Sequence, residues 1–231
     1  MQTYPVFVLI TGKPCLVVGG GSVAERKVQD LLQAGARVTV VSPVLTPALA
    51  AQAGAGEIRH LQGDFREEQV AGMALVIGAT DDMEVNARVS AAAQARGIWV
   101  NIVDQPDLCT FIVPAQVRRG ELTLAISTGG ASPALARQIR EELEDHFGPE
   151  YGPYLALMQA VRSQVLTVRR GDPDNAVIFK RLVASPLLPA LSRGDAAEVR
   201  RILREVLGEV LDSAAIEEIL KYLSWQPLVS S

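Results

Sequence analysis

The stretch VVGGGSVAERK, residues 17–27, decides the fold because it places a glycine-dense turn between an apolar run and a helix-like run. Its spacing, Gly19-x-Gly21-x-x-Ala24, fits the dinucleotide-binding fingerprint. In that fingerprint the first glycine makes a tight turn, and the second lets the backbone approach a pyrophosphate. The small third residue lets the helix pack on the sheet. The N–H groups that open the helix then face the phosphates.

Three glycines in a row also occur in sharp bends that bind no ligand. The flanking pattern decides between a phosphate-binding turn and a merely structural one. Residues 15–18 form a short apolar run typical of a buried strand. After the turn, apolar residues from Ala24 to Leu32 recur at helical spacing before Gly35, a residue suited to end a helix. This order predicts a dinucleotide site in which the cofactor lies against Gly19, Gly21, Ser22 and Val23.

The composition is that of an ordinary globular protein, with 48% hydrophobic and 21% charged residues among 231. The net charge of −4 provides no basic field and no base-readout motif occurs, so we expect no nucleic-acid partner. Cys15 and Cys109 are too few for a disulfide framework, which favours a reducing cytoplasm. No secretory signal is recognisable and the apolar runs are too short to span a bilayer, so no membrane insertion is expected.

Strand-like and helix-like runs alternate over the first part of the chain, which predicts an α/β fold with a Rossmann-like, doubly wound parallel sheet. The expected strands cover residues 15–18, 37–41, 58–61, 75–79 and 99–103. A further strand is expected at residues 6–10, as an antiparallel arm beside residues 14–18. An alanine-rich helix that ends at Gly97 is predicted between the last two strands of the sheet.

The pattern changes in the middle of the chain. Strands at residues 110–113 and 121–127 are predicted on either side of Arg118-Arg119-Gly120, and Ser132-Pro133 then starts a helix. Its apolar residues recur every four positions and are expected in the core: Leu135, Ile139 and Leu143. A block this small needs a partner, so we predict a small α+β dimerisation segment.

No strand pattern follows Gly148-Pro149, and a helical C-terminal domain is predicted instead. Its amphipathic helices are expected at residues 155–168, 176–183, 196–207 and 213–223. The predicted organisation therefore has three parts: a dinucleotide-binding Rossmann domain at 1–112, the dimerisation segment at 113–148 and the helical domain at 149–231.

Ligands of an open α/β sheet bind outside the carboxyl ends of its strands. Ser42, followed by Pro43, stands where an Asp or Glu would bind the ribose 2′-hydroxyl, so it either binds the ribose or begins the turn. The missing acid leaves NAD and NADP unresolved. Thr80 and Asp81 follow a central strand, and their turn is predicted to lie along the cofactor. Asp81 or Asp82 is expected to cap the next helix.

Asp104 leaves the last parallel strand toward the same edge and has no following helix to cap. We predict a general base or an electrostatic partner of the substrate, with an Asx-turn before Pro106 as the alternative. A second glycine turn, residues 127–133, either forms a nest for an anionic group or is a serine-capped loop. His60 and His146 have no spacing that suggests a metal site with the cysteines, so no metal is expected.

Five segments of the chain have the order and spacing of one known family. They are 17–27, Ala79-Thr80-Asp81-Asp82 with Val85-Asn86, Asn101-Ile102-Val103-Asp104, Phe111-Ile112-Val113-Pro114 and Ser127-Thr128-Gly129-Gly130-Ala131-Ser132-Pro133. Over roughly the first 150 residues the chain resembles the precorrin-2 dehydrogenase module of siroheme synthase.

The resemblance implies a homodimer that uses NAD to oxidise the tetrapyrrole precorrin-2 to sirohydrochlorin, with Asp104 as the catalytic residue. The carboxylates of such a substrate match N–H, hydroxyl and guanidinium groups. The candidate substrate residues are Ser127, Thr128, Gly129, Arg119 and Arg137.

Two points stay open within this interpretation. Some members of the family also insert iron into the product, and the residues do not decide whether this chain does so. Several fused members carry a serine where Thr128 stands, so a regulatory role tied to serine is not expected. The competing interpretation is an NAD-sensing regulatory domain, which shares the glycine fingerprint but needs no acid at Asp104.

Overall fold

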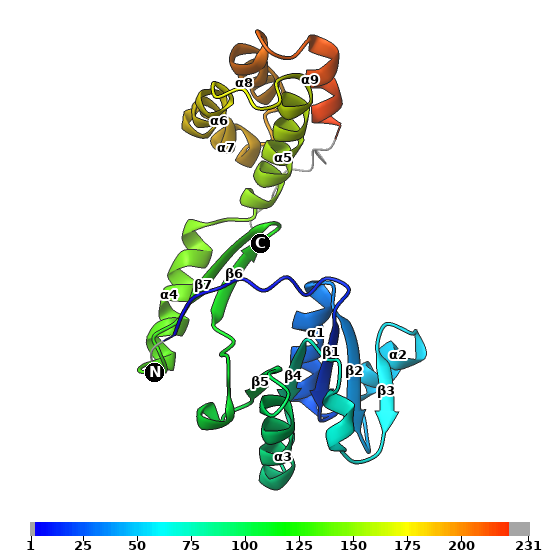
Figure 1. The fold of residues 1–231 in the computed structure, drawn as a ribbon. Helices are drawn as coiled ribbons and strands as arrows, with labels where there is room; N and C mark the ends of the chain where they lie inside the picture. The colour runs from blue at the N-terminus through cyan, green and yellow to red at the C-terminus, as the bar shows by residue number, and fades with distance from the viewer. Residues whose placement is uncertain (1–2, 222–231) are drawn as a thin grey trace. The chain divides into compact units, whose positions relative to one another are not determined.

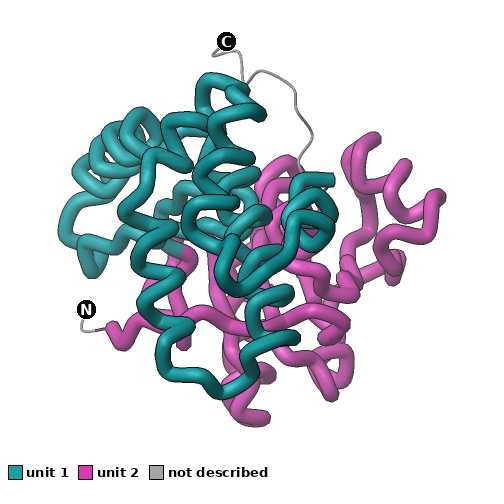
Figure 2. The backbone as a smooth tube through the Cα atoms, turned by 90° about the horizontal axis from the view of Figure 1, so that it is seen from above, with its two compact units in different colours: residues 1–2, 114–231 teal, residues 3–113 magenta. Residues whose placement is uncertain are grey.

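The computed structural model describes residues 3–221, and its contacts separate two compact units, Thr3–Val113 and the chain from Pro114 onward (Figure 2). Each unit is described here by itself. The three-part division at residues 112 and 148 stays a prediction.

The first unit is a parallel α/β sheet (Figure 1). Its elements are β1 (Pro14–Val18), α1 (Ser22–Gln33), β2 (Arg37–Ser42), α2 (Pro47–Gly54), β3 (Arg59–Gln62), the 3-10 turn η1 (Glu67–Val70), β4 (Leu75–Gly78), α3 (Met83–Gln94), β5 (Trp99–Ile102) and the 3-10 turn η2 (Pro106–Leu108). The five strands run in the order β3-β2-β1-β4-β5, and every pair is parallel. The predicted sheet is confirmed.

Alternate residues of the central strand β1 supply two different cores. Cys15 and Val17 pack with apolar residues of α1 and with Leu49 of α2. Leu16 and Val18 pack on the other face with α3 and η1. A strand that is buried on both faces reads as a continuous apolar run, which explains why β1 was predictable from the sequence.

Two predicted strands are wrong. Residues 6–10 form no strand, and most of their side chains are exposed. Residues 110–113 form none either, because only Thr110 pairs with the sheet edge, its N–H donating to the Val100 carbonyl oxygen at 2.8 Å. The strand of this region begins later, after Pro114.

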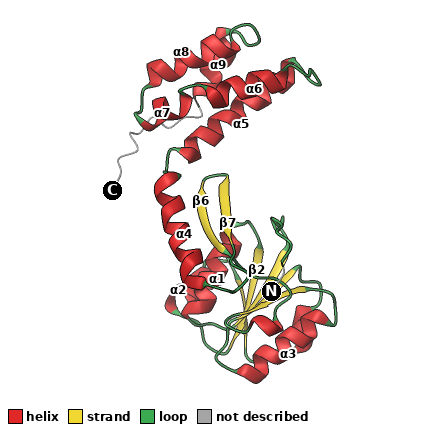
Figure 3. Cartoon of the chain, turned by 90° about the vertical axis from the view of Figure 1, so that its left-hand side faces the viewer, coloured by secondary structure: helices red, strands yellow, loops and turns green. Residues whose placement is uncertain are grey.

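The second unit begins with a hairpin and a helix. β6 (Ala115–Arg119) and β7 (Leu122–Ile126) are antiparallel, and α4 (Pro133–His146) lies along them (Figure 3). Ser132 caps α4 as predicted, its hydroxyl accepting from the Leu135 N–H at 3.2 Å. The expected burial of the α4 stripe is wrong for Leu135, which is 47% exposed, and only Ala136 of this helix is buried.

The remaining helices share one apolar core. They are α5 (Tyr151–Val168), α6 (Asn175–Ala184), α7 (Leu187–Ser192), α8 (Ala196–Leu207) and α9 (Ser213–Leu220). Leu157, Leu182 and Leu203 are fully buried in this core. The helical C-terminal region is confirmed, although the end of the last predicted helix, at residue 223, lies outside the described residues. Within the described chain, no helix is long and apolar enough to cross a membrane.

Two helices were missed. α2 begins at Pro47 after the cap Thr46, the same signal as Ser132-Pro133, but its alanine-rich sequence buries only Leu49 and shows little periodicity. α7 has six residues and follows Pro186, between two of the predicted helices. A short helix with little apolar periodicity gives a weak sequence signal.

Candidate functional site

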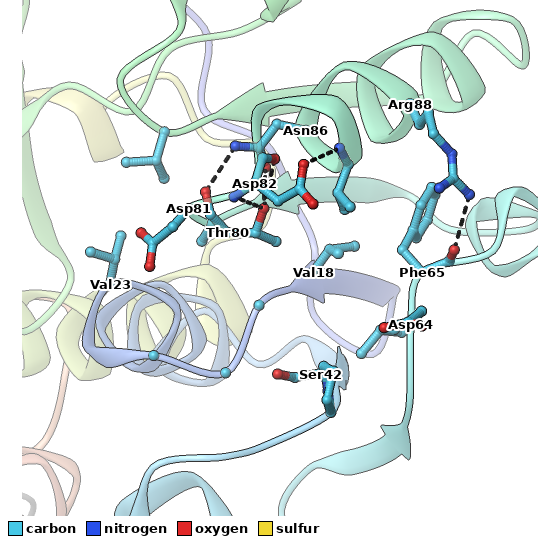
Figure 4. A pocket seen from close by; sticks show the side chains of 18 of the residues that line it. Val18, Val23, Ser42, Asp64, Phe65, Thr80, Asp81, Asp82, Asn86 and Arg88 are labelled. Atoms are coloured by element: carbon cyan, nitrogen blue, oxygen red, sulfur yellow. Dashed lines mark hydrogen bonds between the residues drawn. The ribbon is translucent and has the colours of Figure 1, made fainter.

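A cavity of about 800 Å³ opens at the carboxyl ends of the parallel strands (Figure 4). Its walls come from the turns that follow all five strands of the sheet. The predicted residues that line it are Gly19, Gly21, Ser22, Val23, Ser42, Pro43, Thr80, Asp81 and Asp104. The fold therefore brings the nine candidates for cofactor binding and catalysis to one hollow.

The glycine turn is fixed by close backbone packing. Gly19 has a φ of +124°, and a Cβ atom on it would lie 2.3 Å from the Ala79 carbonyl oxygen. A Cβ atom on Gly20 would lie 2.1 Å from the Val44 carbonyl oxygen. Gly21 differs, because a Cβ atom there would meet nothing within 4 Å. Two glycines thus shape the turn, and the third, which lines the cavity, has open space around its Cβ position.

The N-terminus of α1 suits a phosphate. In the same unit, Thr46 caps α2 and Asp82 caps α3, but no side chain caps α1, whose N-cap is Gly21. The first turn of α1, whose Ser22 and Val23 line the cavity, therefore has no side-chain acceptor for its N–H groups. A dinucleotide pyrophosphate would satisfy them and complement the helix dipole, so the turn fits NAD.

A hydrogen-bonded ladder holds the turn after β4. The Nδ2 of Asn86 donates to the Thr80 carbonyl oxygen at 2.9 Å, and the Thr80 hydroxyl lies 3.2 Å from Asn86 Oδ1 (Figure 4). Asp82 accepts from the N–H groups of Glu84 and Val85, so the predicted capping role belongs to this residue. Asp81 is exposed to the cavity.

Asn86 and Gly20 line the cavity but are absent from the predicted site residues. Asn86 enters the sequence analysis only as part of a motif. The structure shows why the motif has a polar residue there: Asn86 is only 2% exposed and bonds to Thr80. Gly20 occupies a variable position of the fingerprint, yet it makes the closest approach of the three glycines. The only feature of the sequence that pointed to Gly20 is the run of three consecutive glycines.

Asp104 has an unusual backbone. Its φ is +59°, and within residues 3–221 it is the only residue other than glycine with a positive φ. Its side chain is exposed and makes no hydrogen bond or ion pair there, so the predicted Asx-turn is not formed. Such strain persists where the surroundings impose it, and it is concentrated at functional sites.

Neighbouring groups hold the strand end that presents Asp104. The Cys109 thiol accepts from the Ile102 N–H at 3.1 Å, and the Nδ2 of Asn101 donates to the Phe111 carbonyl oxygen at 3.0 Å. These contacts tie the returning chain to β5. The carboxylate of Asp104 is thereby presented from an ordered loop on the cavity wall.

The second glycine turn is closed by its own hydroxyls. The Gly129 N–H donates to Ser127 Oγ at 3.1 Å, and the Ser132 N–H donates to Thr128 Oγ1 at 3.2 Å. The turn therefore has the features of the serine-capped loop. The other candidate substrate residues, Arg119 and Arg137, lie in the same unit as this turn, and the cavity lies in the other unit.

Arg119 is engaged in the structure of its own unit. Its Nε donates to the Phe147 carbonyl oxygen at 2.9 Å, and its Nη2 donates to that of Glu144 at 3.2 Å, both near the C-terminus of α4. Arg137 instead lies on the outer face of α4. It pairs with Glu141, whose hydrogen bond raises the pKa of the guanidinium.

We expect Arg119→Ala to lower the free energy of unfolding by about 1–3 kcal/mol, because it removes a cation and its bonds from the last carbonyls of a helix. Arg137→Ala, the matched control on the same helix and hairpin block, is expected to leave the unfolding midpoint unchanged. Urea denaturation followed by circular dichroism measures both. Equal stability of the two variants would contradict the structural role of Arg119.

Comparisons with known proteins agree with this geometry. Residues 6–115 match the family model described as "Putative NAD(P)-binding", and residues 119–146 match the model of the central region of the sirohaem biosynthesis protein. The siroheme synthase of Methylobacillus flagellatus is 52% identical over 207 residues, which cover 90% of this chain and 44% of that protein. The chain is therefore similar to sirohaem biosynthesis proteins over most of its length.

A further relative and a solved structure agree with this similarity. The siroheme synthase of Thioalkalivibrio sulfidiphilus is 42% identical over 216 residues, which cover 92% of this chain and 44% of that protein. The chain thus spans less than half the length of these sirohaem family relatives. The solved structure of SirC, a precorrin-2 dehydrogenase, matches with a TM-score of 0.73 and 26% identity, over 89% of this chain and all of that one. The likeness confirms the predicted fold, and the family model supports NAD as the cofactor.

Proposed function

We propose that the chain is an NAD-dependent dehydrogenase that oxidises precorrin-2 to sirohydrochlorin. One observation carries the proposal: an unpaired carboxylate, Asp104, is held in a left-handed conformation on the wall of a cavity that the Gly19–Gly21 turn and the uncapped start of α1 also line. The SirC structure, matched over its whole length, has the activity that such a site suits.

The reaction removes a hydride and a proton from the tetrapyrrole. Bound NAD supplies the hydride acceptor. In this proposal Asp104 takes the proton or orients the substrate, because it lines the cavity and its side chain has no partner within residues 3–221. The Thr80–Asn86 ladder positions the turn along which the cofactor would lie. The nine cofactor and catalytic candidates of the cavity keep their predicted roles in this proposal.

The substrate contacts and the assembly are further parts of the proposal. Ser127, Thr128, Gly129 and Arg137 are the candidates for the substrate carboxylates, and Arg119 would act there mainly by supporting α4. A homodimer is supported by the exposed Leu135 and by the hairpin strand β7, none of whose residues is fully buried. Burial raises the pKa of the Cys15 thiol to about 11, and two free thiols suit the reducing cytoplasm that we propose.

The test is an anaerobic assay of the full chain with precorrin-2 and either NAD or NADP. We expect NADH and sirohydrochlorin to form in equal amounts, followed by absorbance, and light scattering to give the mass of a dimer. Ferrous ion added after the oxidation measures iron insertion separately. NAD binding without turnover would instead support an NAD-sensing domain, and no NAD binding would contradict both functions.

A further inference from the structure

The end of β2 lacks the charge with which many dinucleotide sites recognise a ribose. Ser42 stands at that place, only 7% exposed, and its hydroxyl donates to the Val44 carbonyl oxygen at 2.7 Å. An Asp or Glu there would accept a hydrogen bond from the 2′-hydroxyl of NAD. Ser42 brings no negative charge, so a preference for NAD over NADP requires another side chain.

The neighbouring strand brings a carboxylate to the same place. β3 runs parallel to β2 with Gln62 opposite Ser42, and the Gly63 N–H donates to the Ser42 carbonyl oxygen at 3.2 Å. Gly63 has a φ of +128°, a conformation that favours glycine, and it turns the chain into Asp64. Asp64 and Ser42 both line the cavity, and Figure 4 shows them next to each other.

The Asp64 carboxylate is available to a ligand. It is exposed and makes no hydrogen bond or ion pair within the described chain. Arg88 is the basic residue among those that line the cavity, but its guanidinium contacts Phe65 and forms no ion pair with Asp64. Its Nη2 donates to the Phe65 carbonyl oxygen at 3.2 Å, and its guanidinium lies 5.9 Å from the centre of the Phe65 ring. The charge of Asp64 is therefore not neutralised by an ion pair.

Burial of the next residue holds Asp64 at the cavity wall. Phe65 is 4% exposed and packs in the core on the α3 face of the sheet. On the other side, the Gly63 bond to Ser42 joins the loop to the end of β2. The carboxylate thus sits on a short segment that is anchored at both ends.

We propose that Asp64 supplies from β3 the acid that is missing at the end of β2, and thereby selects NAD over NADP. The inference rests on the proposed dinucleotide site. The carboxylate accepts a hydrogen bond from a ribose 2′-hydroxyl. It repels a 2′-phosphate, a monoester with a charge of about −1.5 to −2 at neutral pH.

Calorimetric binding of NAD and NADP to the full chain tests this role in the wild type and in Asp64→Asn. We expect the wild type to bind NAD more tightly than NADP, and the variant to lower the ratio of the two Kd values, NADP over NAD, by about tenfold. Because the discrimination is electrostatic, added salt is expected to lower this ratio in the wild type and to leave it unchanged in the variant.

Glu67→Gln is the matched control, because it removes one exposed negative charge three residues along that does not line the cavity. Its Kd ratio is expected to equal that of the wild type. The role of Asp64 would be overturned if the Kd ratio of Asp64→Asn equalled that of Glu67→Gln, or if the wild type bound both nucleotides equally. Either result would leave the dinucleotide site itself in place. A wild type that binds neither nucleotide would refute the dinucleotide site itself.

Discussion

Replacing Asp104 by Asn is expected to lower the rate of precorrin-2 oxidation by about 10²–10⁴-fold, the usual contribution of a positioned acid or base. NAD binding is expected to stay unchanged. Asn tolerates a positive φ as well as Asp does, so the substitution removes the charge and leaves the backbone at +59°. Single-turnover formation of NADH measures the rate, and calorimetry measures NAD binding in parallel.

Asp107→Asn provides the control for this experiment. Asp107 is an exposed acid three residues along the same loop, and it does not line the cavity. We expect this variant to keep the wild-type rate. Full activity of Asp104→Asn, or equal losses in both variants, would show that the carboxylate of Asp104 takes no part in the chemistry.

The conformation of Asp104 gives an independent reason to expect this loss. A left-handed conformation costs a residue other than glycine about 1–2 kcal/mol. Glycine would relieve the strain, and twelve glycines of the described chain do have a positive φ. An aspartate whose carboxylate makes no local bond gains nothing in stability that would offset this cost, so the chemistry of the group is its simplest reason.

The strands β1, β2, β4 and β5 were predictable because most of their residues are buried, which gives apolar runs with clear ends. Each predicted strand of the sheet lies within one residue of its observed bounds, including β3, which has no buried residue. Residues 6–10 are just as apolar but pair with no neighbour. Apolar character alone does not show whether a strand has a partner.

The site was predictable only as far as topology decides it. Carboxyl ends of parallel strands meet at one edge, so Gly19, Ser42, Thr80 and Asp104 could be grouped from strand order alone. The role of Asn86 depends on side-chain bonds that cross six residues to Thr80, and no spacing rule encodes those bonds. The sequence also does not show that the guanidinium of Arg119, a candidate for substrate binding, donates to carbonyl oxygens at the end of α4.

Gly19→Ala and Gly21→Ala are expected to fail in different ways. A Cβ atom on Gly19 would lie 2.3 Å from the Ala79 carbonyl oxygen, at a φ of +124°. We expect Gly19→Ala to lower the free energy of unfolding by about 2–5 kcal/mol, because overpacking and backbone strain add. Denaturant unfolding followed by circular dichroism measures this loss.

Gly21→Ala places the same methyl group where nothing lies within 4 Å, so we expect the unfolding free energy to change by less than about 1 kcal/mol. Its effect is expected on the ligand instead, with a Kd for NAD raised at least about tenfold, because the methyl group fills space next to the phosphate position. Wild-type NAD affinity in a folded Gly21→Ala protein would contradict a pyrophosphate at this turn. The pair of variants thus separates the glycine that the fold requires from the glycine that the cofactor requires.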